Sequence, residues 1–221
     1  MANFLSILML ALGLTSACAT MIEMKPVEVT APDGDVSYGA ALLAAAQLGY
    51  VADSISSDKY LSQSRFAGSR DEVTWQIEIT RQGNRVEIRT PSVSGDGKVH
   101  RRVQGFLANI QADAMKYLKI RPAKDLATIG KRATDIAKIE LRNTSPTGCR
   151  SLGFISVSTF NKDPRVANVA LRNMFQIETL IRGGNTAVTE NVNSVYAPGA
   201  IGYNYSLSGT GYDCSLAGGK A

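Results

Sequence analysis

The chain has 221 residues, of which 44% are hydrophobic and 19% are charged, and its formal net charge is +5. This length suits one large or two small globular domains, and the hydrophobic content is ordinary for a folded protein. The low share of charged residues argues against a long solvating tail. A modest positive charge suits an anionic partner or simply a soluble surface.

The first residues form the most unusual segment, because no charged side chain precedes Glu23. The mostly apolar run from Phe4 to Leu14 is too short for a bilayer, which needs about 20 residues. Small residues follow it at positions 15–18, a pattern typical of a signal peptide and its cleavage site. No Lys or Arg lies in residues 1–4, which is a departure from that pattern. We expect residues 1–17 to form an export signal.

Residues 14–18, Leu-Thr-Ser-Ala-Cys, resemble a bacterial lipobox, in which the cysteine becomes the lipidated first residue. Thr15 departs from the usual Leu, and Ala19 resembles the outer-membrane sorting pattern of such lipoproteins. The resemblance predicts lipid attachment at Cys18 and anchoring on the periplasmic face of the outer membrane. Two alternatives stay open. Cleavage after Ala19 would release a soluble periplasmic protein, and Cys18 could also stay a buried or free thiol.

Beyond Ala19 the chain has two cysteines, Cys149 and Cys214, so one pairing is possible. Disulfides persist in the oxidising compartment that an exported chain enters. We therefore expect a disulfide between them, with two buried thiols as the alternative. Closing a loop of about 65 residues is worth about 4 kcal/mol in the chain-entropy model.

Residues 18–32 show no clear periodicity, and we expect a tether there. An alanine-rich helix is expected to begin near Asp35 or Ser37 and to end at Gly49. Alternating apolar residues then predict strands, and apolar residues three and four apart predict a second helix. The strands are 50–55, 60–66, 73–80 and 86–90, and the helix is 99–118. Residues 33–121 therefore read as an α-β-β-β-β-α domain with two helices on one face of an antiparallel sheet.

We expect residues 122–135 to be a linker with at most a short helix near Asp125. The second domain is expected over 136–215, followed by a flexible tail at 216–221. Asp163-Pro164 is a strong helix start, and Gly183-Gly184 follows the end of the apolar stripe. Strands are expected at 136–141, 154–160, 186–192 and 203–214, with a loop at 193–202. The fold class is α+β, with two small domains, each an antiparallel sheet covered by helix, after a signal peptide.

The second domain resembles the RcsF-like group of small Gram-negative outer-membrane lipoproteins. The shared motifs are a Cys-x-x-Leu-Gly strand, an Ala-x-x-x-Leu-Arg-Asn helix, a Gly-Gly-Asn turn and a late Tyr-x-Cys. Here they are Cys149, Leu152 and Gly153; Ala167, Leu171, Arg172 and Asn173; Gly183, Gly184 and Asn185; and Tyr212 with Cys214. The resemblance implies the fold, the disulfide and the compartment. The stress-sensing member that names the group has two disulfides, so its signalling role does not carry over.

The sequence contains few candidate catalytic residues. His100 is the single histidine, and we expect it to be solvent-facing; a thiol pair of Cys149 with His100 is the alternative. Nothing marks Glu72 or Glu78 above a solvated strand face. The sequence lacks zinc-ligand spacing, a calcium loop and a phosphate-binding loop. We predict no catalytic residues, no metal and no cofactor.

Four basic residues, Arg101, Arg102, Lys116 and Lys119, are candidates for binding anions. Most of them fall opposite the apolar stripe of the second helix, where a solvated face is the simpler interpretation. The expected partners are the membrane, through the lipid, and envelope proteins or anionic envelope polymers, but not nucleic acid. The sequence favours a non-enzymatic envelope binding or sensing module. An accessory subunit of an envelope assembly and a hydrolase with an unseen site are the alternatives.

Overall fold

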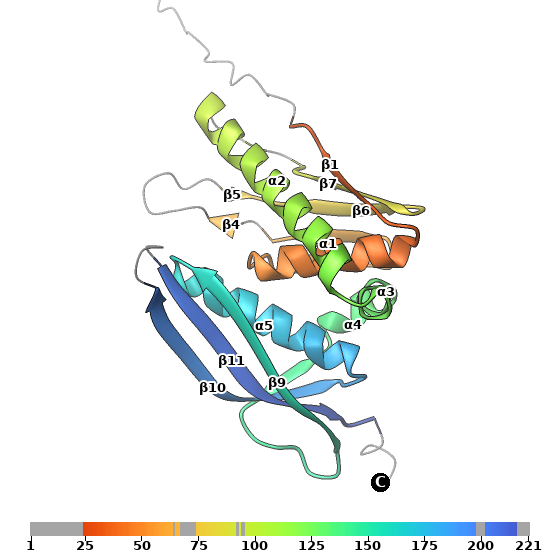
Figure 1. Ribbon diagram of the computed structural model, residues 1–221, viewed down its shortest axis with the longest axis vertical. Coiled ribbons are helices and arrows are strands. Elements are labelled where there is room, and N and C mark those ends of the chain that lie inside the picture. The colour runs from red at the N-terminus through yellow and green to blue at the C-terminus, as the bar shows by residue number, and fades with distance from the viewer. Residues whose placement is uncertain are drawn as a thin grey trace, which may run out of the picture.

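The computed structural model describes residues 24–63, 65–66, 74–91, 93, 96–197 and 202–215. The expected signal peptide, Cys18, Glu72 and the tail at 216–221 lie outside these residues. The fold is α+β, as the sequence predicts, with a five-stranded sheet at one end and a four-stranded sheet at the other. Helices occupy the space between the two sheets (Figure 1).

The first sheet is antiparallel, with the strand order β1-β7-β6-β3-β2. Its strands are β1 (Val27–Thr30), β2 (Ala52–Ile55), β3 (Lys59–Ser62), β6 (Glu78–Gln82) and β7 (Arg85–Arg89). A separate pair is formed by β4 (Arg65–Phe66) and β5 (Thr74–Trp75). Helices α1 (Gly34–Gln47) and α2 (Gly97–Ile120) pack on one face of the sheet. Alternate residues such as Ile79, Val86 and Ile88 are fully buried, as expected for a half-buried sheet.

Helix α1 is buried on all sides, since every residue from Ser37 to Ala46 is buried. It begins after Asp33, whose carboxylate accepts the Asp35 N–H at 2.8 Å as an N-cap. It contacts β6 and β7, α2, α3 (Ala123–Lys131) and α5 (Pro164–Ile181). Small side chains make this possible, because a helix of alanines lets its neighbours approach on every side.

The closest helix contact joins α1 and α3. A Cβ atom on Gly39 of α1 would overlap the backbone carbonyl of Leu126 in α3. The contact is reciprocal, because a Cβ on Gly130 of α3 would overlap the carbonyl of Asp35 in α1. Glycine at both positions is therefore a steric requirement of this crossing.

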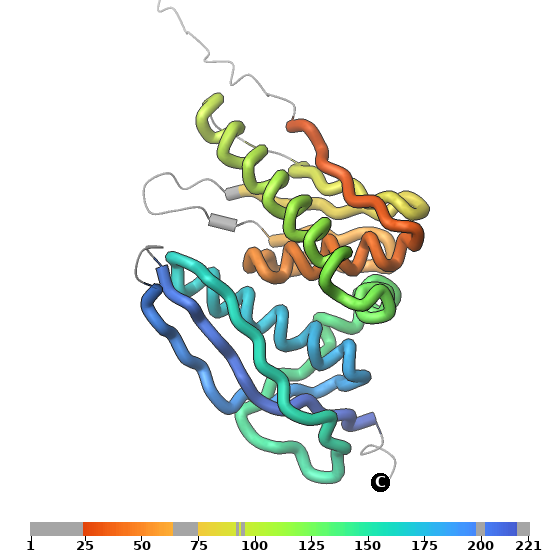
Figure 2. Tube along the Cα trace, in the orientation of Figure 1, coloured from red at the N-terminus to blue at the C-terminus, as the bar shows by residue number. Residues whose placement is uncertain are grey.

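The second sheet has the strand order β8-β10-β11-β9. Its strands are β8 (Glu140–Arg142), β9 (Arg150–Asn161), β10 (Thr186–Ala197) and β11 (Gly202–Asp213). The β8–β10 pair is parallel and the other two pairs are antiparallel. Helix α5 begins at Pro164 after the N-cap Asp163, as predicted, and covers one face of this sheet (Figure 2). Leu171 and Phe175 of α5 share a core with Ile155, Val157 and Leu207 of the strands.

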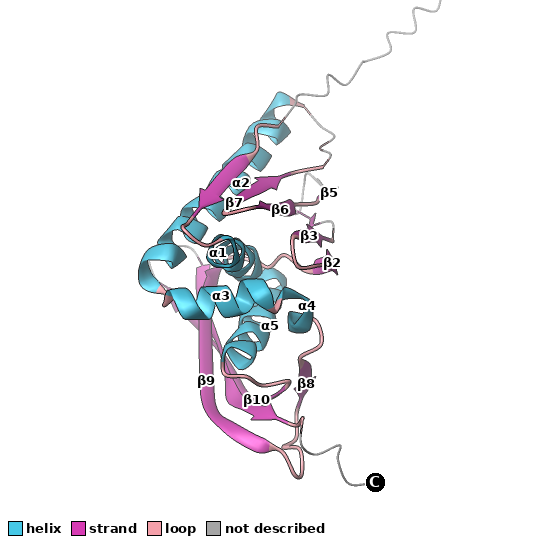
Figure 3. Cartoon of the chain, turned by 90° about the vertical axis from the view of Figure 1, so that its right-hand side faces the viewer, coloured by secondary structure: helices cyan, strands magenta, loops and turns pink. Residues whose placement is uncertain are grey.

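The helices of the two units pack against each other (Figure 3). Helix α1 contacts α5, and α5 also contacts α3 and α4 (Ala133–Ile136). Asn173 of α5 donates to the backbone carbonyl of Tyr50 at 2.8 Å, and Arg121 forms an ion pair with Glu178. The layers therefore run from sheet through two helical layers to sheet.

Several expected element boundaries are wrong. The expected linker at 122–135 forms α3 and α4, because Leu126, Ile129 and Ala133 are buried against the helical layer. The expected tether ends in β1, which pairs with β7. The strand expected at 73–80 is interrupted, and β10 extends to Ala197 through the expected loop. In each case tertiary pairing or packing decides a segment whose local pattern is weak.

We expect Gly39→Ala to lower the free energy of unfolding by about 1–3 kcal/mol, because the added methyl group overpacks the α1–α3 contact. Helix propensity alone predicts the opposite sign, a gain of about 1 kcal/mol. Gly105→Ala is the matched control, since Gly105 is exposed on α2 and a Cβ there meets no described atom within 4 Å. Urea unfolding of both variants measures the two effects, and a gain of stability in Gly39→Ala would contradict the tight crossing.

Candidate functional site

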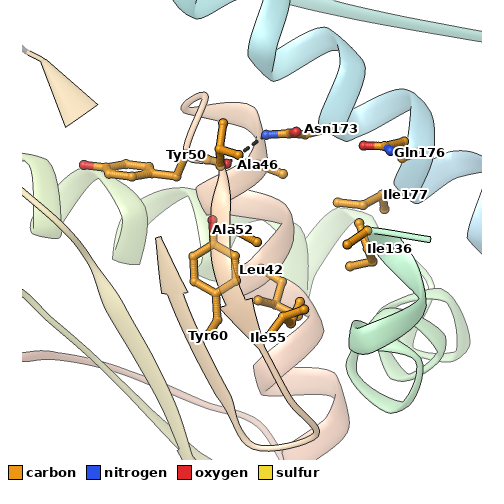
Figure 4. A pocket seen from close by; sticks show the side chains of 12 residues that line it. Leu42, Ala46, Tyr50, Ala52, Ile55, Tyr60, Ile136, Asn173, Gln176 and Ile177 are labelled. Carbon is orange, nitrogen blue, oxygen red and sulfur yellow. Dashed lines mark hydrogen bonds between the residues drawn. The ribbon is translucent and has the colours of Figure 1, made fainter. Parts of the chain in front are cut away.

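A cavity of about 230 Å³ lies where the two units meet. It is bordered by the C-terminal half of α1, the β2–β3 hairpin, α4 and α5, and it is partly open to the surface (Figure 4). The lining residues are Leu42, Ala46, Tyr50, Val51, Ala52, Ile55, Tyr60, Ile136, Ala137, Asn173, Gln176 and Ile177. None of these lining residues carries a charge. The cavity is therefore suited to a neutral and mostly apolar molecule.

The Tyr60 hydroxyl is the polar group of the cavity that most needs a partner. The residue is 5% exposed, and its hydroxyl oxygen is buried without a hydrogen bond to any described group. Burial raises the pKa of Tyr60 far above its ordinary value, and the neighbouring Tyr50 and Tyr38 add to the rise. The hydroxyl therefore stays neutral and is able to donate or accept one hydrogen bond. An unpaired buried hydroxyl costs about 1–3 kcal/mol, and a bound partner would relieve this cost once the lining moves enough to uncover the oxygen.

The other two buried tyrosines near this region are already paired. The Tyr50 hydroxyl accepts the Trp75 Nε1–H at 2.8 Å, and the Tyr38 hydroxyl donates to the Ser56 carbonyl at 3.2 Å. Tyr60 is thus distinguished from its neighbours by its environment and not by its residue type.

Two side-chain amides of α5 complete the polar part of the lining. The Asn173 Nδ2 donates a hydrogen bond to the Tyr50 carbonyl at 2.8 Å, and the Gln176 Nε2 donates one to the Ile139 carbonyl at 2.9 Å. Both amides are thereby held in place by backbone groups of neighbouring segments. Their oxygens are left as acceptors, since no described donor bonds to them.

The predicted Cys149–Cys214 disulfide is present, with an S–S distance of 2.07 Å and a Cα–Cα distance of 4.4 Å. It joins the start of β9 to the end of β11, next to the paired residues Arg150 and Asp213. These two also form an ion pair at 3.2 Å. Because Cys149 is bonded, it presents no thiol, and the catalytic pair with His100 is excluded in this state.

Two expectations about polar residues are wrong. His100 is 4% exposed, because it lies on the same face of α2 as the buried residues Val103, one turn later, and Leu107, two turns later. Its Nδ1 lies 2.7 Å from the Asp96 carbonyl, and its Nε2 has no described partner. Glu78 is also buried, where Arg89 at 2.7 Å and Lys59 at 3.3 Å neutralise it. Burial opposes ionisation of Glu78, but these two cations lower its pKa overall.

The four basic candidates, Arg101, Arg102, Lys116 and Lys119, are all exposed on α2. None of them forms an ion pair with an acidic group that the structure describes. They lie away from the cavity, whose lining contains no residue of α2. The structure therefore separates two features: a neutral cavity between the units and a basic surface on one helix.

Among the described residues, no three His, Cys, Asp or Glu side chains gather in a group that could hold a metal ion. Within that same part of the chain, none of the helices is both long and apolar enough to span a bilayer. Comparison with protein-family models, curated proteins and solved structures found no match. The resemblance to the RcsF-like group stays a prediction.

Removing the disulfide tests its contribution to the second sheet. We expect Cys149→Ser with Cys214→Ser to lower the free energy of unfolding by up to about 4 kcal/mol, because the loop between them becomes free in the unfolded chain. Denaturant unfolding measures the change, and reduction of the unaltered chain with dithiothreitol should reproduce it. Equal stability of both forms would show that the sheet pairing alone holds this end closed.

Proposed function

We propose that this chain is a cell-envelope lipoprotein that acts as a non-enzymatic binding module for a small, neutral, mostly apolar ligand. The observation that carries the proposal is the cavity between the units, with the unpaired Tyr60 hydroxyl in its lining. Lipid attachment at Cys18 and the periplasmic face of the outer membrane rest on the resemblance of residues 14–18 to a lipobox. A soluble periplasmic protein is the alternative if Cys18 is removed.

The size and chemistry of the cavity define the ligand class. Liquid water occupies about 30 Å³ per molecule, so 230 Å³ corresponds to about eight waters. This is somewhat below the range of about 300–1,000 Å³ typical of drug-sized ligands. The ligand is therefore small, with an apolar body against Leu42, Ile55 and Ile177. It carries one hydroxyl or carbonyl group that bonds to Tyr60 after a small shift of the lining, because the hydroxyl oxygen itself is buried and does not face the open space of the cavity.

Binding fits this lining better than catalysis does. General acid or base catalysis works best when the pKa of the catalytic group lies near the operating pH. Burial moves the pKa of Tyr60 away from neutrality, and Asn173 and Gln176 do not titrate. The lining can thus recognise a ligand by hydrogen bonding, but it offers no efficient proton donor or acceptor.

A specific observation supports an accessory subunit as the second candidate. Strand β8 pairs only with residues 186–188 of β10, so the edge of β10 from 190 to 197 has no partner strand among the described residues. Val192, Val195 and Tyr196 on this edge are 53–65% exposed. An open strand edge with apolar side chains is a surface on which another sheet can add.

Tyr60→Phe tests the proposed ligand site. We expect the ligand-free variant to be more stable by about 1 kcal/mol, because an unpaired buried hydroxyl is removed. The same variant should bind 1-naphthol, a small neutral aromatic alcohol, about five- to tenfold more weakly than the unaltered protein, because one hydrogen bond is lost. Calorimetric titration and thermal unfolding measure the two effects.

Tyr38→Phe is the matched control for this experiment. The Tyr38 hydroxyl is paired with the Ser56 carbonyl, and the residue does not line the cavity. We therefore expect the control to lose stability and to keep its affinity for 1-naphthol. Equal binding by the unaltered protein and Tyr60→Phe would contradict the assignment of the site.

The anchor is tested separately by the intact mass of protein purified from membranes. We expect a mature chain that begins at Cys18, carries acyl groups and gains two protons when Cys149–Cys214 is reduced. A mass that begins at Thr20 without lipid would overturn the lipoprotein assignment but would leave the cavity proposal intact.

A further inference from the structure

We propose that the exposed basic face of α2 docks on the anionic phospholipid surface of the membrane in which the lipid on Cys18 is inserted. The basic face consists of Lys98, Arg101, Arg102, Lys116 and Lys119. The inference rests on the proposed lipid attachment at Cys18, and it adds the orientation of the protein on its membrane.

The first argument is the position of these residues on the helix. At 3.6 residues per turn, all five project within about 100° of one another. Lys98 and Lys119 are 21 residues apart, so the face extends about 32 Å along the axis. The other residues on this face are small or uncharged, including Gly105, Asn109 and Ala112. The positive charges therefore lie on one side of the helix as two groups, three near its N-terminus and two near its C-terminus, separated by about 21 Å of uncharged surface.

The second argument is the absence of direct ion pairs. None of the five basic side chains forms an ion pair with an acidic group in the described part of the chain. Two acidic residues lie near the basic face: the N-cap Asp96, whose pKa is lowered by backbone hydrogen bonds and by the nearby Lys98 and Arg101, and Asp113, whose pKa is raised by burial although Lys116 opposes the rise. Most other exposed arginines, such as Arg85, Arg150 and Arg165, do have carboxylate partners. Five basic side chains against these two carboxyl groups leave the face with a net positive charge for an external partner.

The third argument is the length of chain between the lipid and the helix. The Lys25 N–H donates to the Gln104 side chain at 3.2 Å, and Gln104 donates back to the Lys25 carbonyl at 3.0 Å. The backbone at residue 25 is therefore fixed to α2, one turn from Arg101. Seven residue steps from Cys18 to Lys25 span at most about 25 Å. The lipid consequently holds the N-terminal half of α2 close to the bilayer surface, and β1 begins beside α2 in Figure 2.

The margins of the basic face favour a bilayer over a dissolved polyanion. Met115 and Ile120 are 39% and 60% exposed, and they flank the basic face. A basic helix face with apolar side chains beside it is typical of helices that lie in a membrane interface. Helix α2 also forms an outer edge of the molecule, where a flat surface can reach it (Figure 3).

Vesicle binding by a chain without its lipid isolates this surface. The full chain carrying Cys18→Ala is purified and mixed with vesicles of phosphatidylethanolamine and phosphatidylglycerol, with phosphatidylcholine vesicles as the neutral surface. We expect sedimentation with the anionic vesicles only, and weaker binding as salt increases. Replacing Arg101, Arg102, Lys116 and Lys119 with Gln should reduce the binding at least about tenfold.

The matched control replaces four exposed basic residues outside α2 that form no ion pair with a described acidic group, namely Lys131, Lys162, Arg172 and Arg182, with Gln. Both variants lose four positive charges, so a difference between them reports the location of the charge and not its amount. All eight side chains are exposed, and thermal unfolding should show that both variants fold. The control should keep most of its binding to anionic vesicles.

Three results would overturn the proposal: equal loss in both variants, no binding to anionic vesicles, or α2-dependent binding to peptidoglycan or lipopolysaccharide alone. The intact mass of the membrane-purified protein tests the lipid attachment at Cys18 separately from the docking surface. If Cys18 carries no lipid but α2-dependent vesicle binding persists, the anchor is wrong and the docking surface stands. If the lipid is present and vesicle binding is absent, the anchor stands and the docking surface is wrong.

Discussion

The fold depends on one constraint, the burial of α1 on every side. A helix that contacts a sheet, two helices of its own unit and the helix of the next unit has no face left for an exposed residue, so small side chains are needed wherever a neighbour approaches closely. The alanines from Ala40 to Ala46 and the glycine at position 39 meet this demand, and Gly130 meets it from the other side of the α1–α3 contact. The two units are joined because α1 belongs to both helical layers.

The cavity follows from the same geometry. Small side chains let α1 approach its neighbours, but they do not fill the corner where the β2–β3 hairpin, α4 and α5 meet around Ala46 and Ala52. An apolar space of this size loses dispersion contacts on its walls, and the unpaired Tyr60 hydroxyl adds a polar penalty. Natural interiors usually avoid both costs. Their coincidence at one place is the physical reason to regard this corner as a ligand site.

The sequence predicted those features that local chemistry decides. The N-cap and proline at Asp163-Pro164 determine where α5 begins, and two cysteines beyond Ala19 allow one pairing, which the disulfide confirms. Features that depend on contacts between distant residues were missed. Helix α3 is held by Gly39 of α1, although the spacing of Leu126, Ile129 and Ala133 carried a helical signal. The site joins Leu42, Tyr60 and Asn173, and no sequence pattern relates residues so far apart.

The position of the cavity between two units has a consequence for how a ligand would act. Tyr60 belongs to the first unit, and Asn173, Gln176 and Ile177 belong to the second. A ligand that contacts both walls stabilises the arrangement in which α1 packs against α5, relative to any arrangement in which the two helices separate. The shift in free energy equals the difference between the ligand's binding free energies for the two arrangements. If α2 docks on the membrane as proposed, the first unit is held in place and the second unit is the one that moves. The second unit carries the edge of β10 that has no partner strand among the described residues. Ligand binding and the position of this edge are thus linked through α5, which contacts α1 on one side and the second sheet on the other.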